Sequence, residues 1–180
     1  VIYNLIDAVT KAKDNLASTK EDVSAVMDRF EIDNLDMPEA DFINNVLFLM
    51  NLSKKYNKIV DFTDEIWLPN VLPNVKIQQY DRVLIDEGQD LSPGQIELVL
   101  KAAKPNGRTF VFADRNQAIY QFRSADGRAV DKFKERLNAQ TYPLPITYRC
   151  PISVVKKAQE LVPALEIWEK AIEGEVKNIS

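Results

Sequence analysis

Residues 80–114, "YDRVLIDEGQDLSPGQIELVLKAAKPNGRTFVFAD", decide the fold of this chain. The apolar run at its start predicts a strand at 80–87, and the β-branched and aromatic run at its end predicts another at 108–114. Between them a serine, a proline and a glutamine open a helix at 92–95, which we expect the Pro-Asn-Gly at 105–107 to stop. Such a βαβ unit predicts a parallel sheet whose strands are covered on both faces.

The remaining sequence adds helices on one side of this unit and a further βα unit on the other. Residues 1–58 carry apolar side chains at three- and four-residue spacing, which predicts a small all-α subdomain. After the second strand, we expect a helix at 129–139, a strand at 142–148 and a helix at 151–162. We therefore predict an α/β fold, with a parallel sheet and flanking helices over 59–180, and an N-terminal all-α subdomain.

Composition excludes several classes of function. One cysteine and no histidine exclude an internal disulfide, common zinc sites and histidine-based catalysis. The net charge of −4 gives no overall basic field, so a contact with nucleic acid would need a local groove. No apolar run reaches membrane-spanning length and no signal peptide opens the chain, so we expect no membrane contact and a reducing, cytoplasmic compartment.

The predicted strands end in carboxylates. Asp86 and Glu87 finish the first strand and Asp114 finishes the second, and in a parallel sheet both strands end at the same edge. Mg²⁺ prefers one or two carboxylates with waters and phosphate oxygens, and a second acid there can orient or deprotonate an attacking water. The alternative is an acidic turn that favours the positive end of the following helix. These residues alone leave both interpretations open.

Longer motifs carry a resemblance to a known family. "VLIDEGQD" (83–90) resembles the DExQD form of the Walker B motif in UvrD/Rep-like superfamily 1 DNA helicases. "FVFADRNQAIYQFRSAD" (110–126) resembles the next motif of that family, and "LPITYRCPISVVKKA" (144–158) resembles its fourth. "VDFTDEIWLP" (60–69) is similar to the segment before Walker B, and "AKDNLAS" (12–18) to the start of the family's helical insertion. The motifs occur in the family's order.

The resemblance implies a partial RecA-like P-loop NTPase domain that uses ATP and Mg²⁺. Asp86 would coordinate the metal, and Glu87 would lie at the metal and activate the hydrolytic water. Gln89 would link the state of the nucleotide to neighbouring segments, and Asp90 would support the turn. Gln117 would sense the γ-phosphate.

The resemblance also assigns residues that bind adenine and single-stranded DNA. Tyr148 would stack on the adenine, and Arg149 would contact the γ-phosphate as an arginine finger supplied in cis. Tyr120, Phe122 and Arg123 would reach towards single-stranded DNA or couple it to the ATP site. Aromatic faces stack on any base, and arginine offers a rigid fork of donors to phosphate oxygens.

Some of these residues have a purely structural alternative. Tyr120 and Phe122 would also suit a core, and Arg123 would also suit an ion pair with a Walker B carboxylate. Phe62 is placed by the resemblance on the DNA path, together with Asp64 and Trp67. A packing role for these three residues is an open alternative.

The chain departs from the family pattern in small ways and in one large way. Ala113 and Ser124 stand where the family has glycine, and Thr147 stands where it has asparagine, while the acidic and arginine positions are intact. No glycine is followed by Lys-Ser or Lys-Thr, so the phosphate loop G-x-x-x-x-G-K-[ST] is absent. We therefore predict an internal segment that neither hydrolyses ATP nor unwinds DNA without the remaining helicase domains.

Three functions remain open for the parent protein. The first is an ATP-dependent helicase or translocase that couples hydrolysis to movement on single-stranded DNA. The second is a non-catalytic DNA-binding or regulatory remnant of the helicase fold. The third is the helicase part of a helicase–nuclease of the RecB type.

Overall fold

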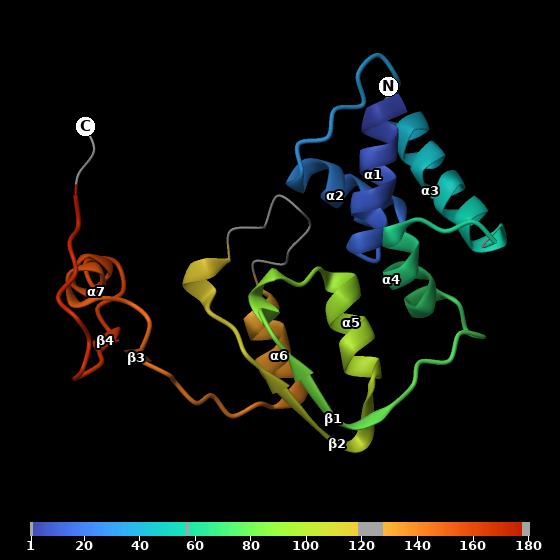
Figure 1. Ribbon diagram of the computed structural model, residues 1–180. Coiled ribbons are helices and arrows are strands. Elements are labelled where there is room, and N and C mark those ends of the chain that lie inside the picture. The colour runs from blue at the N-terminus through green and yellow to red at the C-terminus, as the bar shows by residue number, and fades with distance from the viewer. Residues whose placement is uncertain (1, 57, 119–127, 178–180) are drawn as a thin grey trace. The chain divides into compact units, whose positions relative to one another are not determined.

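The computed structural model describes residues 2–56, 58–118 and 128–177 (Figure 1). The chain divides into two compact units, Val1–Ala139 and Gln140–Ser180. Helices and small parallel sheets make up both units, in agreement with the predicted α/β class. Within the described residues, no helix is long and apolar enough to cross a membrane.

Four helices form the N-terminal part of the first unit: α1 (Ile2–Asp14), α2 (Lys20–Arg29), α3 (Glu39–Lys55) and α4 (Phe62–Val71). They enclose one hydrophobic cluster, whose buried members are Ala8, Ala12, Ala17, Val23, Val26, Met27, Phe42, Ile43, Val46, Met50, Trp67 and Leu68. Because α4 contributes to this cluster, it packs with the helices that precede it. The division at residue 58 stays a prediction.

Local capping sets where these helices begin. Thr19 is the N-cap residue of α2, and its hydroxyl accepts a hydrogen bond from the Asp22 N–H at 3.1 Å. The Asp22 carboxylate accepts from the Thr19 and Ser18 N–H groups at 2.9 Å each, and these bonds lower the pKa of Asp22. Pro38 is the N-cap residue of α3 and so precedes its first turn.

The predicted βαβ unit is present. It consists of β1 (Tyr80–Ile85), α5 (Pro93–Lys101) and β2 (Ala103–Val111), and the two strands are parallel. The helix ends at Lys101, before the Pro-Asn-Gly at 105–107, so this tripeptide is not what stops it. Those three residues belong to β2, near an irregularity in its pairing with β1. A further helix, α6 (Ala129–Leu137), follows as predicted.

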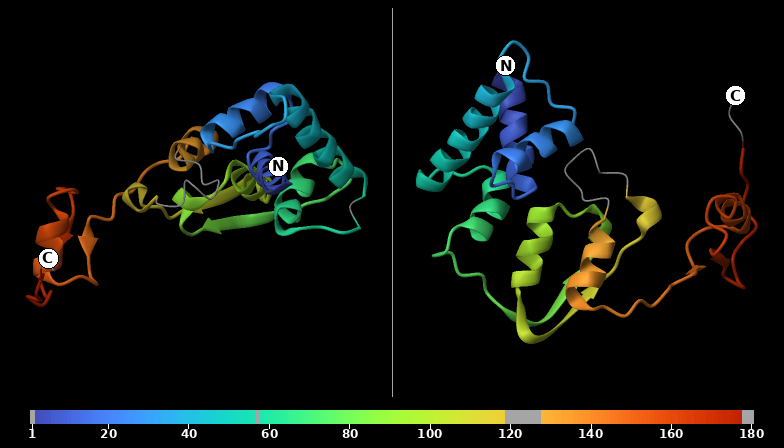
Figure 2. Two further views of the ribbon diagram at one scale, coloured as in Figure 1. Left: turned by 90° about the horizontal axis from the view of Figure 1, so that it is seen from above. Right: turned by 180° about the vertical axis from the view of Figure 1, so that it is seen from behind.

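Helices α5 and α6 cover one face of the β1–β2 sheet (Figure 2). Ile85 of β1 is buried together with Ile96 of α5 and Phe133 of α6. On the opposite face, Leu84 is 67% exposed and Phe110 is 44% exposed. The prediction of strands covered on both faces therefore holds for one face only, because both described helices of this cluster pack on the same side.

The second unit contains β3 (Ile146–Thr147), α7 (Ile152–Ala158) and β4 (Glu166–Ile167). The predicted strand at 142–148 is shorter than expected and pairs in parallel with β4, so within the described residues it does not extend the first sheet. Among the described residues of this unit, Val155 is the only hydrophobic side chain that is fully buried.

Candidate functional site

The carboxyl ends of β1 and β2 bring the predicted carboxylates to one edge. Asp86 and Glu87 directly follow the last residue of β1 and are exposed, while Asp114 lies just beyond β2 and is half-buried. The Gly88 N–H donates to the Phe112 carbonyl at 2.9 Å, so hydrogen bonding between the two chain segments continues past the strands. The two strand ends are therefore joined at the acidic edge.

The backbone at Glu87 is strained. Glu87 has φ 50° and ψ 42°, a left-handed conformation that costs a residue with a Cβ roughly 1–2 kcal/mol. The next residue, Gly88, has no room for a side chain, because a Cβ there would lie 2.6 Å from Cγ1 of Val111. Strained residues of this kind cluster at functional sites, where the surrounding structure holds them in place.

Gln89 connects the two strand ends through its side chain. It is 2% exposed, although its amide is polar. Its Nε2 donates to Oε2 of Glu87 at 2.7 Å, and its Oε1 accepts from the N–H of Asp114 at 3.0 Å. A buried amide is costly unless it is hydrogen-bonded, and here both ends have partners. Gln89 thus fixes the Glu87 carboxylate against the segment after β2.

Asp114 extends this connection into the short 3-10 helix η2 (Arg115–Gln117). Its Oδ1 accepts from the Asn116 N–H at 2.9 Å, and its Oδ2 accepts from Nε2 of Gln117 at 2.8 Å. Gln117 is exposed. A continuous series of hydrogen bonds therefore runs from Glu87 through Gln89 and Asp114 to Gln117.

Two ion pairs attach the surroundings of the acidic edge to α6. Arg115 of η2 pairs with Asp131, and Arg136 pairs with Glu97 of α5. The hydrogen bond and the charge of Glu97 raise the pKa of Arg136. All four side chains are at least partly exposed, so each pair contributes little to stability, about 0–1 kcal/mol, and mainly sets position.

The acidic edge has a donor set that suits a divalent cation shared with a phosphate. Asp86 and Glu87 supply two exposed carboxylates, and Mg²⁺ takes one or two such groups together with waters and phosphate oxygens. Within the described residues there is no group of three or more acidic, histidine or cysteine side chains that would hold a metal by itself. The residues therefore fit a metal that arrives with a nucleotide.

Phe62 lies at the N-terminus of α4 and is 89% exposed. The preceding residue, Asp61, caps the helix and forms a capping box with Asp64. Trp67, in contrast, is 1% exposed and belongs to the core of the first unit. For the two aromatic residues near 60–69, the structure therefore separates an accessible ring from a packing one.

Lys13 supports this end of α4 from a buried position that the sequence did not reveal. Its Nζ lies 2.7 Å from Oδ1 of Asp64 and 3.5 Å from Oδ2 of Asp61, and the residue is 2% exposed. The same ammonium lies 5.4 Å from the centre of the Trp67 ring. The available signal was the position of Lys13 on the apolar side of α1, next to Ala12. A lysine that is buried there requires a charged partner.

The second unit carries two of the predicted nucleotide-binding residues. Tyr148 follows β3 and is 69% exposed, and Arg149 beside it is also exposed. The ring of Tyr148 contacts the ring of Trp168, which sequence reasoning missed, with centroids 5.7 Å apart. The remaining predicted DNA-binding residues, Tyr120, Phe122 and Arg123, lie outside the described residues.

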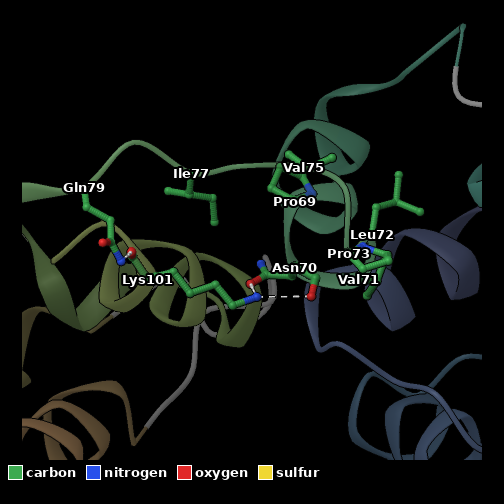
Figure 3. A pocket seen from close by; sticks show the side chains of 9 residues that line it. All are labelled: Pro69, Asn70, Val71, Leu72, Pro73, Val75, Ile77, Gln79 and Lys101. Carbon is green, nitrogen blue, oxygen red and sulfur yellow. Dashed lines mark hydrogen bonds between the residues drawn. The ribbon is translucent and has the colours of Figure 1, made fainter. Parts of the chain in front are cut away.

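A shallow cavity of about 470 Å³ lies beside the start of β1 (Figure 3). It is lined by the end of α4, the segment that leads to Gln79, and Lys101 of α5. The Lys101 ammonium donates to the carbonyl and to Oδ1 of Asn70, at 3.1 and 2.9 Å. The carboxylates follow the opposite end of β1, so the cavity takes no part in the acidic edge.

Comparisons with known proteins agree with the motifs. The family described as UvrD/REP helicase N-terminal domain matches residues 3–138. The "Probable DNA helicase II homolog" of Mycoplasma genitalium is 28% identical over 61% of this chain and 16% of its own length. "ATP-dependent DNA helicase PcrA" of Leuconostoc citreum is 30% identical over 60% of this chain and 16% of its own length. A chain of the ATP-dependent helicase/nuclease of Geobacillus kaustophilus is 29% identical over 53% of this chain and 9% of its own length.

Proposed function

This chain belongs to the UvrD/REP helicase N-terminal domain family, and from this premise we propose that it is part of an ATP-dependent DNA helicase that couples hydrolysis to movement on single-stranded DNA. Residues 59–180 form part of a RecA-like ATPase domain, and residues 1–58 form the helical insertion. The matched relatives are much longer than this chain, which spans 9–16% of their length. We expect the rest of the cytoplasmic parent protein to supply the phosphate loop, without which these residues are inactive.

The proposal assigns a role to each candidate residue at the nucleotide. Asp86 and Glu87 hold Mg²⁺, which when bound neutralises charge on the phosphates. Glu87 also orients the attacking water and accepts its proton. Gln117 senses the γ-phosphate, Arg149 contacts it during transfer, and Tyr148 stacks on the adenine.

The observation that carries the proposal is the series of hydrogen bonds from Glu87 through Gln89 and Asp114 to Gln117. This series connects the carboxylate that we assign to water activation with the residue that we assign to the γ-phosphate, and it supports a coupling between them. Gln89 supports this coupling from a buried position that leaves its side chain no alternative partner in water.

The residues assigned to the DNA strand are aromatic and cationic. Tyr120, Phe122 and Arg123 follow Gln117 in the sequence, so the sensor and the DNA contacts belong to one segment. Phe62 offers a second, exposed aromatic face for a base. Because stacking is indifferent to base identity, the grip suits an enzyme that moves along any strand.

Glu87→Gln in the intact protein tests the proposal. We expect DNA-stimulated ATP hydrolysis to fall about 10²- to 10⁴-fold, the usual contribution of a general base, while affinity for oligothymidylate is retained. Glu135→Gln is the matched control, because it neutralises an exposed carboxylate on α6 outside the acidic edge. Undiminished hydrolysis in Glu87→Gln would refute the assignment.

A helicase–nuclease of the RecB type is the second candidate, and the match to a helicase/nuclease chain favours keeping it. ATP-dependent degradation of linear duplex DNA by the intact protein would select it. The sequence of the parent protein and an ATP hydrolysis assay distinguish the helicase from a non-catalytic remnant. A Gly-Lys-Thr or Gly-Lys-Ser loop before Val1 and hydrolysis by the wild type would both exclude it.

A further inference from the structure

The ends of β3 and β4 place two aromatic side chains at one register position. Thr147 pairs with Ile167 in parallel, so the next residues, Tyr148 and Trp168, leave the small sheet at the same end. Their ring centroids lie 5.7 Å apart and their planes are inclined by 59°, within the range in which tilted aromatic pairs attract. Tyr148 is nevertheless 69% exposed, so the contact leaves much of its ring accessible.

Contacts between the segments that follow these two residues hold the pair together. The Ile152 N–H donates to the carbonyl of Ile172 at 2.8 Å. Gly174, at φ +70°, lies so close to Pro151 that a Cβ on the glycine would be 2.4 Å from the Cβ of the proline. The two segments are therefore held together by backbone, and the ring contact is a consequence of the fold.

We infer that Trp168 is a positioning residue of the nucleotide-binding site, which holds the Tyr148 ring so that its open face receives the base of ATP. The inference rests on the proposed function, in which Tyr148 stacks on adenine. An exposed ring loses rotamer freedom when a ligand orders it, and a neighbouring ring that has already ordered it removes that cost. Arg149 follows Tyr148 directly, so a phosphate-binding group stands beside the base-binding one, which favours a nucleotide over a DNA base.

The test compares Trp168→Ala, Trp168→Phe and Tyr148→Ala in the intact protein, by the Kd for Mg-ADP and the KM and kcat for ATP. We expect Trp168→Ala to raise Kd and KM about 2- to 10-fold, in keeping with one aromatic pair, and to leave kcat unchanged. Trp168→Phe should restore near-normal values, since it keeps an aromatic ring at the position. Tyr142→Ala, which removes a 73% exposed ring from the same unit, is the matched control.

Tryptophan fluorescence gives a readout that does not depend on turnover. Mg-ADP should change the emission of the wild type, and this change should be absent from Trp168→Phe, whereas oligothymidylate alone should not produce it. A response of Trp168 to oligothymidylate alone would overturn the inference in favour of a DNA base. If Tyr148→Ala weakens nucleotide binding and Trp168→Ala does not, the inference fails while the proposed function stands. If neither weakens it, the assignment of Tyr148 fails as well.

Discussion

The two pairs of parallel strands are followed by different kinds of side chain, acidic in the first unit and aromatic in the second. The segments that follow β1 and β2 carry the carboxylates of Asp86, Glu87 and Asp114, whereas those that follow β3 and β4 carry the rings of Tyr148 and Trp168. At the acidic edge a buried glutamine side chain joins the two strand ends, and at the aromatic edge a ring contact joins them. In the proposed function, such strand ends present groups for a metal and phosphates in one unit and for a base in the other.

The two edges also differ in what supports them. In the first unit, α2, α4 and α5 each begin with a complete capping box, and the helices and strands enclose two hydrophobic clusters. In the second, the N-cap residue of α7 is Pro151, which makes no side-chain hydrogen bond, and Val155 is the one fully buried hydrophobic residue among those described. The acidic edge therefore depends on a packed core, and the aromatic edge on a few contacts. Four sets of substitutions test this difference.

Phe133→Ala should have the largest effect. Phe133 is 2% exposed and packs beneath the acidic edge, so we expect the free energy of unfolding of the first unit to fall by about 3–5 kcal/mol. Urea unfolding followed by circular dichroism measures the loss. Phe62→Ala is the matched control, because its ring is 89% exposed and its loss should cost less than about 0.5 kcal/mol.

Gly88→Ala and Gly174→Ala compare the two edges directly. In each case the new methyl group would meet a neighbour, Cγ1 of Val111 at 2.6 Å or Cβ of Pro151 at 2.4 Å. We expect each to destabilise its own unit by about 1–3 kcal/mol, as overpacking does. Hydrogen exchange followed by mass spectrometry locates the loss, and a loss of protection in the wrong unit would contradict the division into two units.

Glu87→Gly should leave the first unit more stable than Glu87→Ala does. Both variants remove the carboxylate and the hydrogen bond that it accepts from Gln89, so they differ only in the Cβ. Glycine adopts φ 50° without the Cβ penalty, so we expect the free energy of unfolding of Glu87→Gly to exceed that of Glu87→Ala by up to about 1 kcal/mol. Equal stabilities of these two variants in chemical denaturation would show that the left-handed backbone carries no strain.

Asp22→Asn should have the smallest effect, a few tenths to about 1 kcal/mol of stability at pH 7, as for other helix caps. Because the fold lowers the pKa of Asp22, its contribution is complete above the ordinary pKa of an aspartate and is lost as pH falls through the lowered value. The stability difference between wild type and Asp22→Asn should therefore shrink on acidification. A difference that grows towards low pH would contradict this assignment.

Patterns within a few residues of sequence predicted much of the first unit. The capping box at Ser92 and the placement of Asp86 and Glu87 beyond a strand depend on near neighbours. The parallel pairing of β1 and β2 was predicted by the general rule for strand–helix–strand units. The second unit was predicted less well. The predicted strand at 142–148 is longer than β3, which pairs with β4 instead of extending the first sheet among the described residues. An apolar run indicates that a strand is present, but it does not show which strand it pairs with.

The sequence by itself determined the order of the motifs, the start of the helix after Ser92 and the chemical type of the residues at the strand ends. Only the tertiary structure decided that Gln89 links Glu87 to Asp114, that Lys13 pairs with Asp64, and that Trp168 meets Tyr148. Periodicity and capping act between residues three or four positions apart, and so they can be read along the chain. The contacts of Gln89 with Asp114, of Lys13 with Asp64 and of Trp168 with Tyr148 join segments about 20 or more residues apart, and such pairs are settled by packing of the whole fold.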